Sequence, residues 1–565
     1  MNFLTSWLNA SIRFQNNYAE HLRKRFQICA SPIARVWLEQ QWIEPRGLTA
    51  ALAHQSRVVI TGAPGAGKTT TLAYLAISFA QAMRQREKPR VPLFFSARDL
   101  NPAALPRLTD IHRALNLSQD LATHCPPRFF PEAFRAGRAI VLIDDADALS
   151  ADQLQTWLHE LSGARVIVSA SSPIAGFTEF RLPGFRDNDI EQFATKWNAA
   201  QASAFMVALK ASGVPRALTA NPMMLTLLTQ VWREGQPLPT QRTALFDAIV
   251  ENTLQDADET ATMLEGVALA MQRGKPASNE FVVKSKGFLR LGKQRTAEFT
   301  HELWQAYFAA RALRHAPTLE PLLEHLTDPA WREVVLFYAG LGDASGLVER
   351  LIAQNDFAFA GWVVAHAHEV RAELRDAVTQ ELIARAWDGN DAAIAALSEM
   401  QNDAAVDTFA AKLKEKDPTV RIRAAQLLGQ LQLDRGIEYL LPQLRDISAD
   451  VRDAVVEALG RSRTDRVIEP LLVSLRGDPR VGVTDTRLRV AAAQALGEIA
   501  SDKAAPALMV DLQLGEPEVR AVAANALKRI ASPLVRKPLE SIARSGDEQA
   551  RQYAAEILAV LNGKD

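Results

Sequence analysis

The C-terminal part of the chain repeats itself, and this repeat strongly restricts how that part can fold. An aliphatic residue followed by arginine recurs five times, each time ahead of small residues and a leucine or isoleucine. The arginines are Arg421, Arg452, Arg489, Arg520 and Arg551. Successive arginines are 31, 37, 31 and 31 residues apart, so one unit carries a six-residue insertion around residues 480–486. The units show helical apolar periodicity and no strand signal. Repeated helical units that cannot bury an apolar face alone predict an α-solenoid.

The repeated arginines have two interpretations, a row of binding residues or a structural role. Four residues before each arginine lies an acidic residue or a serine, namely Asp417, Ser448, Asp485, Glu516 and Asp547. A side chain at that position can cap the incoming helix and pair with the arginine at i+4. We therefore expect the arginines to stabilise the solenoid, and any binding to occur on its concave surface.

Composition excludes several classes of protein. The 565 residues, 48% hydrophobic and 23% charged, suit a globular chain of three or four domains. Lysine and arginine total 64 against 65 aspartates and glutamates, so charge does not indicate a nucleic-acid binder. The two cysteines, Cys29 and Cys125, form neither a disulfide framework nor a zinc cluster. No apolar run approaches the ~18 residues that span a bilayer and no signal peptide is visible, so we expect a cytoplasmic protein without a membrane span.

The rest of the chain changes character twice. Residues 1–45 have helical spacing and a basic run, Arg23-Lys24-Arg25, which we expect on a solvated helix face. From about 46 to 195, β-branched runs alternate with helical stretches, which is typical of a parallel α/β sheet. The runs cover residues 58–60, 92–95, 139–143 and 165–168. After residue 196 strand signals almost vanish, apart from a candidate hairpin that starts at Gly287, includes Lys293 and ends at Phe299.

A loop between the first of these runs and an apolar helix matches the P-loop pattern G-x-x-x-x-G-K-[ST]. It consists of Gly62, Ala63, Pro64, Gly65, Ala66, Gly67, Lys68 and Thr69, and the helix continues with Thr70. The glycines let backbone N–H groups curl around an anion, and the helix N-terminus adds its dipole. We expect all nine residues to bind the nucleotide, with Lys68 on its β- and γ-phosphates and Thr69 on Mg²⁺.

A P-loop needs a second strand that brings a carboxylate to the metal. Asp144 ends the apolar run 139–143 and is expected to hold Mg²⁺ directly or through water. Asp147 follows three residues later and is the candidate for orienting the attacking water. Its alternative role is to cap a helix.

Further motifs follow in a recognisable order. They are PLFFSARDL at 92–100, LIDDAD at 142–147, LPGF at 182–185, NPMMLTLL at 221–228, FTHE at 299–302 and YFAA at 307–310. With the P-loop, these motifs make residues 46–316 resemble the NACHT-type members of the STAND class of signal-transduction P-loop NTPases. The 31-residue units resemble short HEAT repeats.

The resemblance implies roles for two more residues. Pro222 matches a proline that lines the adenine pocket, and His301 matches a winged-helix histidine that contacts the β-phosphate and holds the closed state. Without the resemblance, Pro222 would be a loop breaker and His301 a partly buried histidine.

The chain also departs from the family. Ala148 stands where a glutamate is usual, and Ser171-Ser172 where an arginine is usual before the proline. Each such charged contact is typically worth about 2.7–4 kcal/mol in a transition state, so the departures should slow hydrolysis more than they weaken binding.

The expected fold class is multidomain α/β plus α. It comprises a parallel-sheet P-loop NTPase domain, helical and winged-helix domains and a C-terminal α-solenoid of HEAT-like repeats. The expected boundaries are an N-terminal helical segment 1–45, a nucleotide-binding domain 46–195, a helical domain 196–240, a winged-helix-like domain 241–316, a helical linker or degenerate repeats 317–405, and HEAT-like repeats 406–565.

Two functional hypotheses from different classes follow. In the first, the chain is an ATP/ADP-binding signalling switch, and nucleotide state controls domain opening and homo-oligomerisation. The HEAT repeats then sense or bind a protein partner, any ATPase activity is slow, and a role in signalling or defence is implied by the family alone. In the second, the chain is a HEAT-repeat scaffold with a structural, poorly hydrolysed nucleotide. A processive motor is disfavoured because the usual hydrolytic residues are missing.

Overall fold

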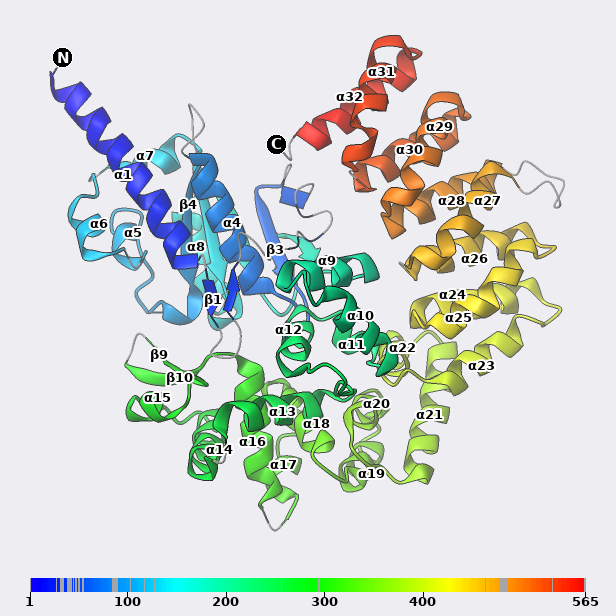
Figure 1. Ribbon diagram of the computed structural model, residues 1–565, viewed down its shortest axis with the longest axis horizontal. Coiled ribbons are helices and arrows are strands. Elements are labelled where there is room, and N and C mark those ends of the chain that lie inside the picture. The colour runs from blue at the N-terminus through cyan, green and yellow to red at the C-terminus, as the bar shows by residue number, and fades with distance from the viewer. Residues whose placement is uncertain are drawn as a thin grey trace. The chain divides into compact units, whose positions relative to one another are not determined.

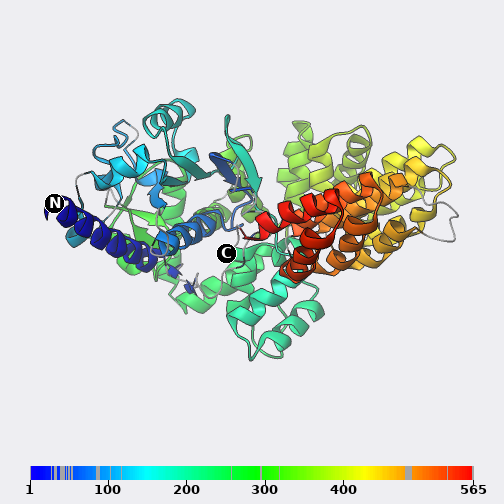
Figure 2. The same ribbon diagram turned by 90° about the horizontal axis from the view of Figure 1, so that it is seen from above.

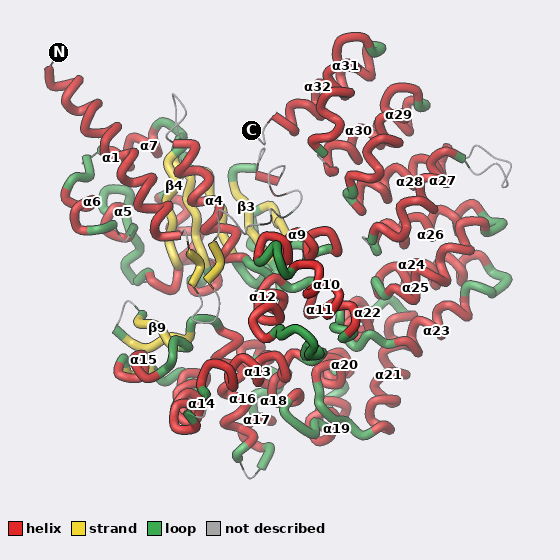
Figure 3. The backbone as a smooth tube through the Cα atoms, viewed as in Figure 1, coloured by secondary structure: helices red, strands yellow, loops and turns green. Residues whose placement is uncertain are grey.

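The chain divides into two compact units, Met1–Ala309 and Ala310–Asp565 (Figure 1). The computed structural model describes residues 2–26, 28–30, 35–37, 43, 45, 48, 51–52, 55–83, 90–101, 103–115, 117–126, 128–255, 257–292, 295–316, 318–462, 464–477, 486–530 and 532–562. Figure 3 shows that the strands gather in the first unit and that the second is built from helices. Among the described residues, no helix is long and apolar enough to cross a membrane.

A five-stranded parallel sheet forms the centre of the first unit, in the order β4-β5-β6-β3-β7. The strands are β3 (Arg57–Thr61), β4 (Val91–Ser96), β5 (Ala139–Asp144), β6 (Arg165–Ser169) and β7 (Thr178–Arg181). The four strands expected from the sequence are confirmed. The fifth, β7, was not predicted because its residues are polar and mostly exposed, as an edge position permits.

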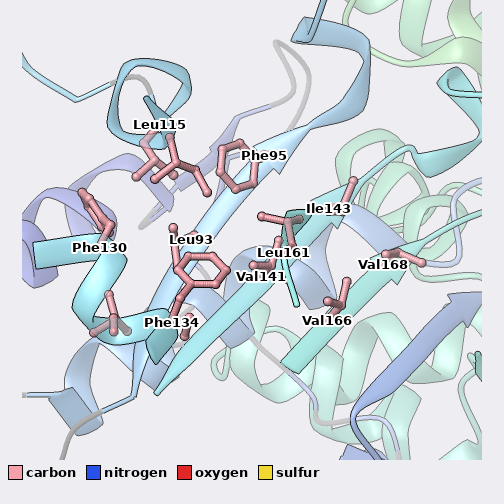
Figure 4. Close-up of a cluster of buried hydrophobic side chains, with 14 of the residues drawn as sticks. Leu93, Phe95, Leu115, Phe130, Phe134, Val141, Ile143, Leu161, Val166 and Val168 are labelled. Carbon is pink, nitrogen blue, oxygen red and sulfur yellow. The ribbon is translucent and has the colours of Figure 1, made fainter. Parts of the chain in front are cut away.

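Alternate residues of the strands build two apolar layers, one on each face of the sheet, because side chains alternate along a strand. Figure 4 shows the first layer, in which side chains from β4, β5 and β6 meet those of helix α7 (Phe129–Arg135). Its labelled members include Leu93, Phe95, Val141, Ile143, Val166 and Val168 from the strands and Phe130 and Phe134 from α7. On the other face, Ile60, Leu142 and Ile167 pack against Leu72 and Leu75 of helix α4 (Lys68–Met83).

The N-terminal helix α1 (Asn2–Phe26) packs into the first apolar layer. Tyr18 is fully buried and its hydroxyl donates to the Pro92 carbonyl at 2.7 Å, which ties α1 to β4. Lys24 is exposed, as expected for the basic run. For Arg25 that expectation is wrong, because its guanidinium donates to the Leu115 carbonyl at 3.1 Å, and burial lowers its pKa.

A short hairpin follows α1, in a segment that we expected to be helical throughout. Strands β1 (Ile28–Ala30) and β2 (Arg35–Trp37) pair antiparallel. Three paired residues a side are too few to leave a periodic signal in the sequence.

The remainder of the first unit is a set of helices with a small antiparallel sheet. The helices are α9 (Asp187–Trp197), α10 (Ala202–Ala211), α11 (Arg216–Thr219), α12 (Pro222–Val231), α13 (Arg242–Leu254), α14 (Asp258–Gln272), α15 (Glu280–Lys284) and α16 (Glu302–Arg314), which runs on into the second unit. The sheet has the order β8-β10-β9, from β8 (Ala277–Ser278), β9 (Leu289–Leu291) and β10 (Thr296–Phe299). The pair β9–β10 confirms the expected hairpin, whose Lys293 lies outside the described residues.

The second unit is helical and ends in paired helices that stack in two layers (Figures 1 and 2). It starts with α17 (Glu320–Leu323), α18 (Arg332–Gly340), α19 (Ser345–Ala353), α20 (Phe357–His366), α21 (Ala372–Trp387), α22 (Asp391–Glu399) and α23 (Asp403–Lys412). The repeated arginines lie on α24 (Pro418–Leu431), α26 (Ala449–Arg461), α28 (Thr486–Ile499), α30 (Pro517–Ile530) and α32 (Glu548–Asn562). The alternating helices are α25 (Asp434–Leu440), α27 (Ile468–Arg476), α29 (Ala505–Leu514) and α31 (Arg536–Ser545).

Three of the five repeated arginines pair with carboxylates more than 20 residues along the chain. Arg421 binds the Asp446 carboxylate at 2.8 and 2.9 Å, and the equivalent pairs are Arg489–Asp511 at 2.9 Å and Arg520–Asp547 at 2.6 Å. Asp417 caps α24 by accepting from the Thr419 N–H at 2.8 Å, as expected.

The expected pairing with the residue four positions earlier is wrong for Arg421 and Arg520, and for Arg489 it falls on Asp485, outside the described residues. The three side chains reach forward, to a carboxylate 22 to 27 residues along the chain. There the five N–H donors of an arginine can bridge successive repeats. Ser448 makes no side-chain cap bond, and Asp485 and most of the insertion lie outside the described residues.

Candidate nucleotide-binding site

The P-loop connects β3 to α4 at the carboxyl edge of the parallel sheet. Gly65 and Gly67 have φ angles of +78° and +91°, which side-chain-bearing residues rarely adopt. The Lys68 ammonium lies over the loop, where it donates to the carbonyls of Gly62 at 2.8 Å and Ala63 at 3.3 Å. The loop is therefore a cradle of backbone groups with one cation at its mouth.

Asp144, the last residue of β5, lies beside the first turn of α4. Its Oδ1 accepts from the Thr69 hydroxyl at 3.1 Å and from the Ser169 hydroxyl at 2.6 Å. The side chain is 5% exposed, and burial, with the nearby charge of Asp145, raises its pKa to about 6. A carboxylate and a threonine hydroxyl in contact are oxygen ligands of the kind that Mg²⁺ prefers, so the residues present fit the expected metal.

Ser169 is a site residue that we did not predict. It ends β6, the strand between β5 and β3, and also accepts the N–H of Asp145 at 2.9 Å. Ser169 thereby positions two consecutive aspartates. The signal for it was a polar residue at the end of an apolar strand, which is weak in isolation.

Asp147 does not cap the following helix, so that alternative is wrong. Helix α8 (Ala151–Glu160) is capped by Ser150, which forms a capping box with Gln153. The Asp147 carboxylate instead accepts from the N–H and the hydroxyl of Ser171 at 2.6 and 2.7 Å. It therefore ties the end of β5 to the segment that follows β6.

An arginine after β4 also joins this edge. Arg98 pairs with Asp145 at 2.8 Å and with Glu302, the first residue of α16, at 3.8 Å. All three side chains are at least about a third exposed (49%, 32% and 51%), so each pair contributes little stability, of the order of 0–1 kcal/mol. Arg98 nevertheless connects the end of the sheet to the turn that holds His301.

His301 lies in the turn between β10 and α16 and is partly buried. Its Nδ1 accepts from the Leu303 N–H at 3.1 Å, which requires this nitrogen to be unprotonated and leaves Nε2 as the donor of a neutral ring. The expected contact with a β-phosphate uses such a donor and remains a prediction.

The start of α12 is bonded to the P-loop. The Asn221 amide donates to the Pro64 carbonyl at 2.9 Å, and the Met223 N–H donates to the Gly65 carbonyl at 3.2 Å. Asn221 also caps α12, with Pro222 at the first helical position. Pro222 is thus placed next to the cradle by its neighbours, and its adenine contact remains a prediction.

The structure brings most of the predicted site residues to one edge of the sheet. The P-loop contacts Asp144 through Thr69, and it contacts Asn221, the neighbour of Pro222. Glu302, next to His301, is joined through Arg98 to Asp145. Asp147 is held by Ser171. Asn221, Ser169 and Arg98 were not predicted as site residues.

Two protein families match the chain. The NACHT domain matches residues 56–201, and the HEAT repeats match residues 375–460, 406–483 and 481–559. The chain therefore contains a nucleotide-binding NACHT domain and C-terminal HEAT repeats.

Similar solved structures include two engineered proteins. They are 23% and 18% identical and cover 34% and 66% of this chain and 92% and 96% of their own, with TM-scores of 0.24 and 0.25. A third is human deoxyhypusine hydroxylase in complex with glycerol, which is 17% identical and covers 38% of this chain and 99% of its own, with a TM-score of 0.15. No curated protein matches the chain.

Proposed function

We propose that this NACHT-domain protein is a STAND-class signalling switch whose state is set by bound ATP or ADP. The observation that carries the proposal is the contact of the P-loop with two other elements, Asp144 at the end of β5 and Asn221 at the start of α12. Because the P-loop contacts two other elements, a change of the nucleotide bound to it can alter the positions of those elements. A ligand shifts such an equilibrium only through its differential affinity for the two states.

The proposed ligand contacts follow from these positions. Residues 62–70 would hold the phosphates, Pro222 the adenine and His301 the β-phosphate, while Thr69 and Asp144 would hold Mg²⁺. Bound Mg²⁺ would neutralise phosphate charge. The raised pKa of Asp144 supports this assignment, because a cation would compensate the buried carboxylate.

Hydrolysis is proposed to be slow. Asp147 would orient the water, but its carboxylate already accepts two hydrogen bonds from Ser171. Ala148 and Ser172 supply neither of the charges that their positions usually carry. The loss of two such charged contacts raises the free energy of the transition state more than it weakens the binding of nucleotide.

We further propose roles for five of the six segments defined in the sequence. The nucleotide-binding domain (46–195), the helical domain (196–240) and the winged-helix-like domain (241–316) would close around ADP. The repeats of 406–565, preceded by the linker 317–405, would bind a protein partner, since HEAT repeats commonly mediate protein interactions. Exchange for ATP would open the closed state and allow homo-oligomerisation.

The alternative is a HEAT-repeat scaffold that keeps a structural nucleotide. The absence of charge at Ala148 and Ser172 favours it, because a nucleotide that is rarely hydrolysed can remain bound as part of the fold. A scaffold would keep the same bound nucleotide and the same mass in solution under all conditions. For a switch, both the bound nucleotide and the mass would change when ADP is replaced by ATP.

The test is the nucleotide content and mass of the full chain, compared with Lys68→Ala. We expect the parent protein to bind ADP and Mg-ATP, and Lys68→Ala to lose most of that affinity without unfolding, since the Lys68 ammonium donates to carbonyls of its own loop. Nucleotide release by chromatography, binding by calorimetry and mass by light scattering are the measurements. Absence of binding by the parent protein at millimolar nucleotide would exclude both the switch and the scaffold.

A further inference from the structure

The amino edge of the parallel sheet, opposite the P-loop, carries a row of arginines. Arg57 and Arg165 are the first residues of β3 and β6, and Arg90 and Arg138 immediately precede β4 and β5. The sheet order β4-β5-β6-β3 places these four residues at the amino ends of adjacent strands. With neighbouring strands about 4.8 Å apart, the row extends over roughly 14 Å.

Three of the four arginines, Arg57, Arg90 and Arg165, line a cavity of about 520 Å³. Ser56, Ser162 and Gly163 contribute small and polar groups to its wall. None of the described residues that line the cavity is acidic. Its volume is within the range of small-molecule sites, about 300–1,000 Å³.

Two of the arginines that line this cavity repel each other. Burial and then the charge of Arg90 lower the pKa of Arg165. Helices α7 and α8 end beside the cavity, at Arg135 and Glu160. An added anion would relieve this repulsion.

We propose that this cavity binds a small soluble anion with more than one phosphate group. Arginine forms bidentate, charge-assisted hydrogen bonds to phosphate oxygens. A row of this length exceeds one phosphate group and suits two or three linked ones. The site lies at the opposite edge of the sheet from the P-loop and does not depend on the nucleotide-binding proposal.

The test uses the full chain with Lys68→Ala, which removes the P-loop lysine, and inorganic tripolyphosphate as the probe. We expect calorimetry to show binding that weakens as salt rises. Adding Arg90→Gln should weaken it about tenfold, because one charged hydrogen-bond donor is lost. Arg90 is exposed, so folding should be retained. The matched control is Arg233→Gln, which removes another exposed arginine, one that donates to the nearby carbonyls of Gln230 and Trp232.

Three outcomes would overturn the proposal. The first is no binding of tripolyphosphate by the Lys68→Ala protein at millimolar concentration. The second is an equal loss of affinity with Arg90→Gln and Arg233→Gln, which would mean that net charge alone attracts the anion. The third is binding of phosphoinositide vesicles or of a single-stranded oligonucleotide without binding of tripolyphosphate, which would assign the edge to a macromolecule.

Discussion

At the scale of single residues, Asp144 is where folding and ligand binding make opposite demands. Its carboxylate is 5% exposed and lies next to Asp145, while the hydroxyls of Ser169 and Thr69 only partly replace its hydration. Burial raises its pKa to about 6, so at neutral pH the fold holds a charge that it disfavours. Such opposed requirements are typical of functional sites.

Asp144→Asn should therefore stabilise the protein when metal and nucleotide are absent. The native pKa of about 6 exceeds the unfolded value of 3.8, so the native state binds the proton more tightly and wild-type stability falls as pH rises between these values. Above pH ~6 the asparagine removes this penalty, by an order of 1–3 kcal/mol. We expect a higher unfolding midpoint than wild type near pH 8 and convergence near pH 4, by scanning fluorimetry across pH.

The control for this prediction is Asp152→Asn, which neutralises an exposed aspartate in the first turn of α8. It should not raise the midpoint, because acidic residues are favourable at a helix N-terminus. A midpoint of Asp144→Asn at or below that of wild type near pH 8 would show that the buried carboxylate is not destabilising.

At the scale of elements, the contact between α12 and the P-loop depends on the absence of a side chain at Gly65. A Cβ atom there would lie 2.9 Å from both the Asn221 Oδ1 and the Met223 Cβ, closer than such contacts tolerate. The φ of +78° adds backbone strain for any other residue. Gly65 thus determines both the shape of the P-loop and the position of α12 against it.

Gly65→Ala should destabilise the ligand-free protein and weaken nucleotide binding, by about tenfold or more, because α12 must move away from the loop. Gly176→Ala is a matched control with φ +80° and no atom within 4 Å of the added Cβ. In this control the free energy of unfolding should fall only by the cost of a positive φ at alanine, about 1–2 kcal/mol, and the nucleotide affinity should be unchanged. Equal effects of the two variants, by calorimetry and thermal unfolding, would mean that the α12 contact contributes nothing.

Sequence reasoning found the elements that carry an unbroken physical signal. Strands β3 to β6 were predicted because they are covered on both faces and are therefore almost wholly apolar. The P-loop was predicted because its glycine-lysine pattern between a strand and a helix is specific. The polar edge strand β7 and the short hairpin β1–β2 lack such a signal.

The residues that join elements were harder to predict than the elements. Asn221 and Ser169 look like ordinary helix-cap and strand-end residues until folding places the P-loop and Asp144 beside them. The partners of the repeated arginines were mistaken for the same reason, since Arg421 meets Asp446 only when consecutive repeats stack. Contacts between segments far apart in the chain have no local pattern.

At the scale of the whole molecule, the C-terminal helices are held together repeat by repeat. Gly429, Gly460 and Gly497 lie where Cβ atoms would come within 2.6 to 2.9 Å of the backbone of the next arginine-bearing helix. Small residues at these positions allow α24, α26, α28 and α30 to approach closely. Each repeat contacts mainly its neighbours, so damage should stay local.

Gly497→Ala should lower the unfolding temperature of the solenoid without changing nucleotide affinity. Alanine gains about 1 kcal/mol of helix propensity, but the clash with Ala526 costs about 1–3 kcal/mol, so the net effect is destabilising. Gly436→Ala, whose nearest neighbour would be 3.5 Å away, should stabilise the same solenoid. Calorimetry with and without ADP measures both effects, and a Gly497→Ala protein with altered ADP affinity would contradict the expectation that damage stays within neighbouring repeats.

The most demanding prediction concerns His301, because it separates the switch from the scaffold. Loss of a hydrogen bond made only in the closed state shifts the closed–open balance by about 1–2 kcal/mol, roughly five- to thirty-fold. His301→Ala should thus release ADP faster and oligomerise more with ATP, as measured by stopped-flow fluorescence and light scattering.

His301 also caps α16 through the Leu303 N–H, so His301→Asn is the matched variant. Asparagine keeps a capping oxygen and loses the Nε2 donor. Faster release in both variants supports a contact with the nucleotide, whereas an effect of alanine alone assigns His301 to capping. A protein that stays monomeric in both variants with ATP is a scaffold.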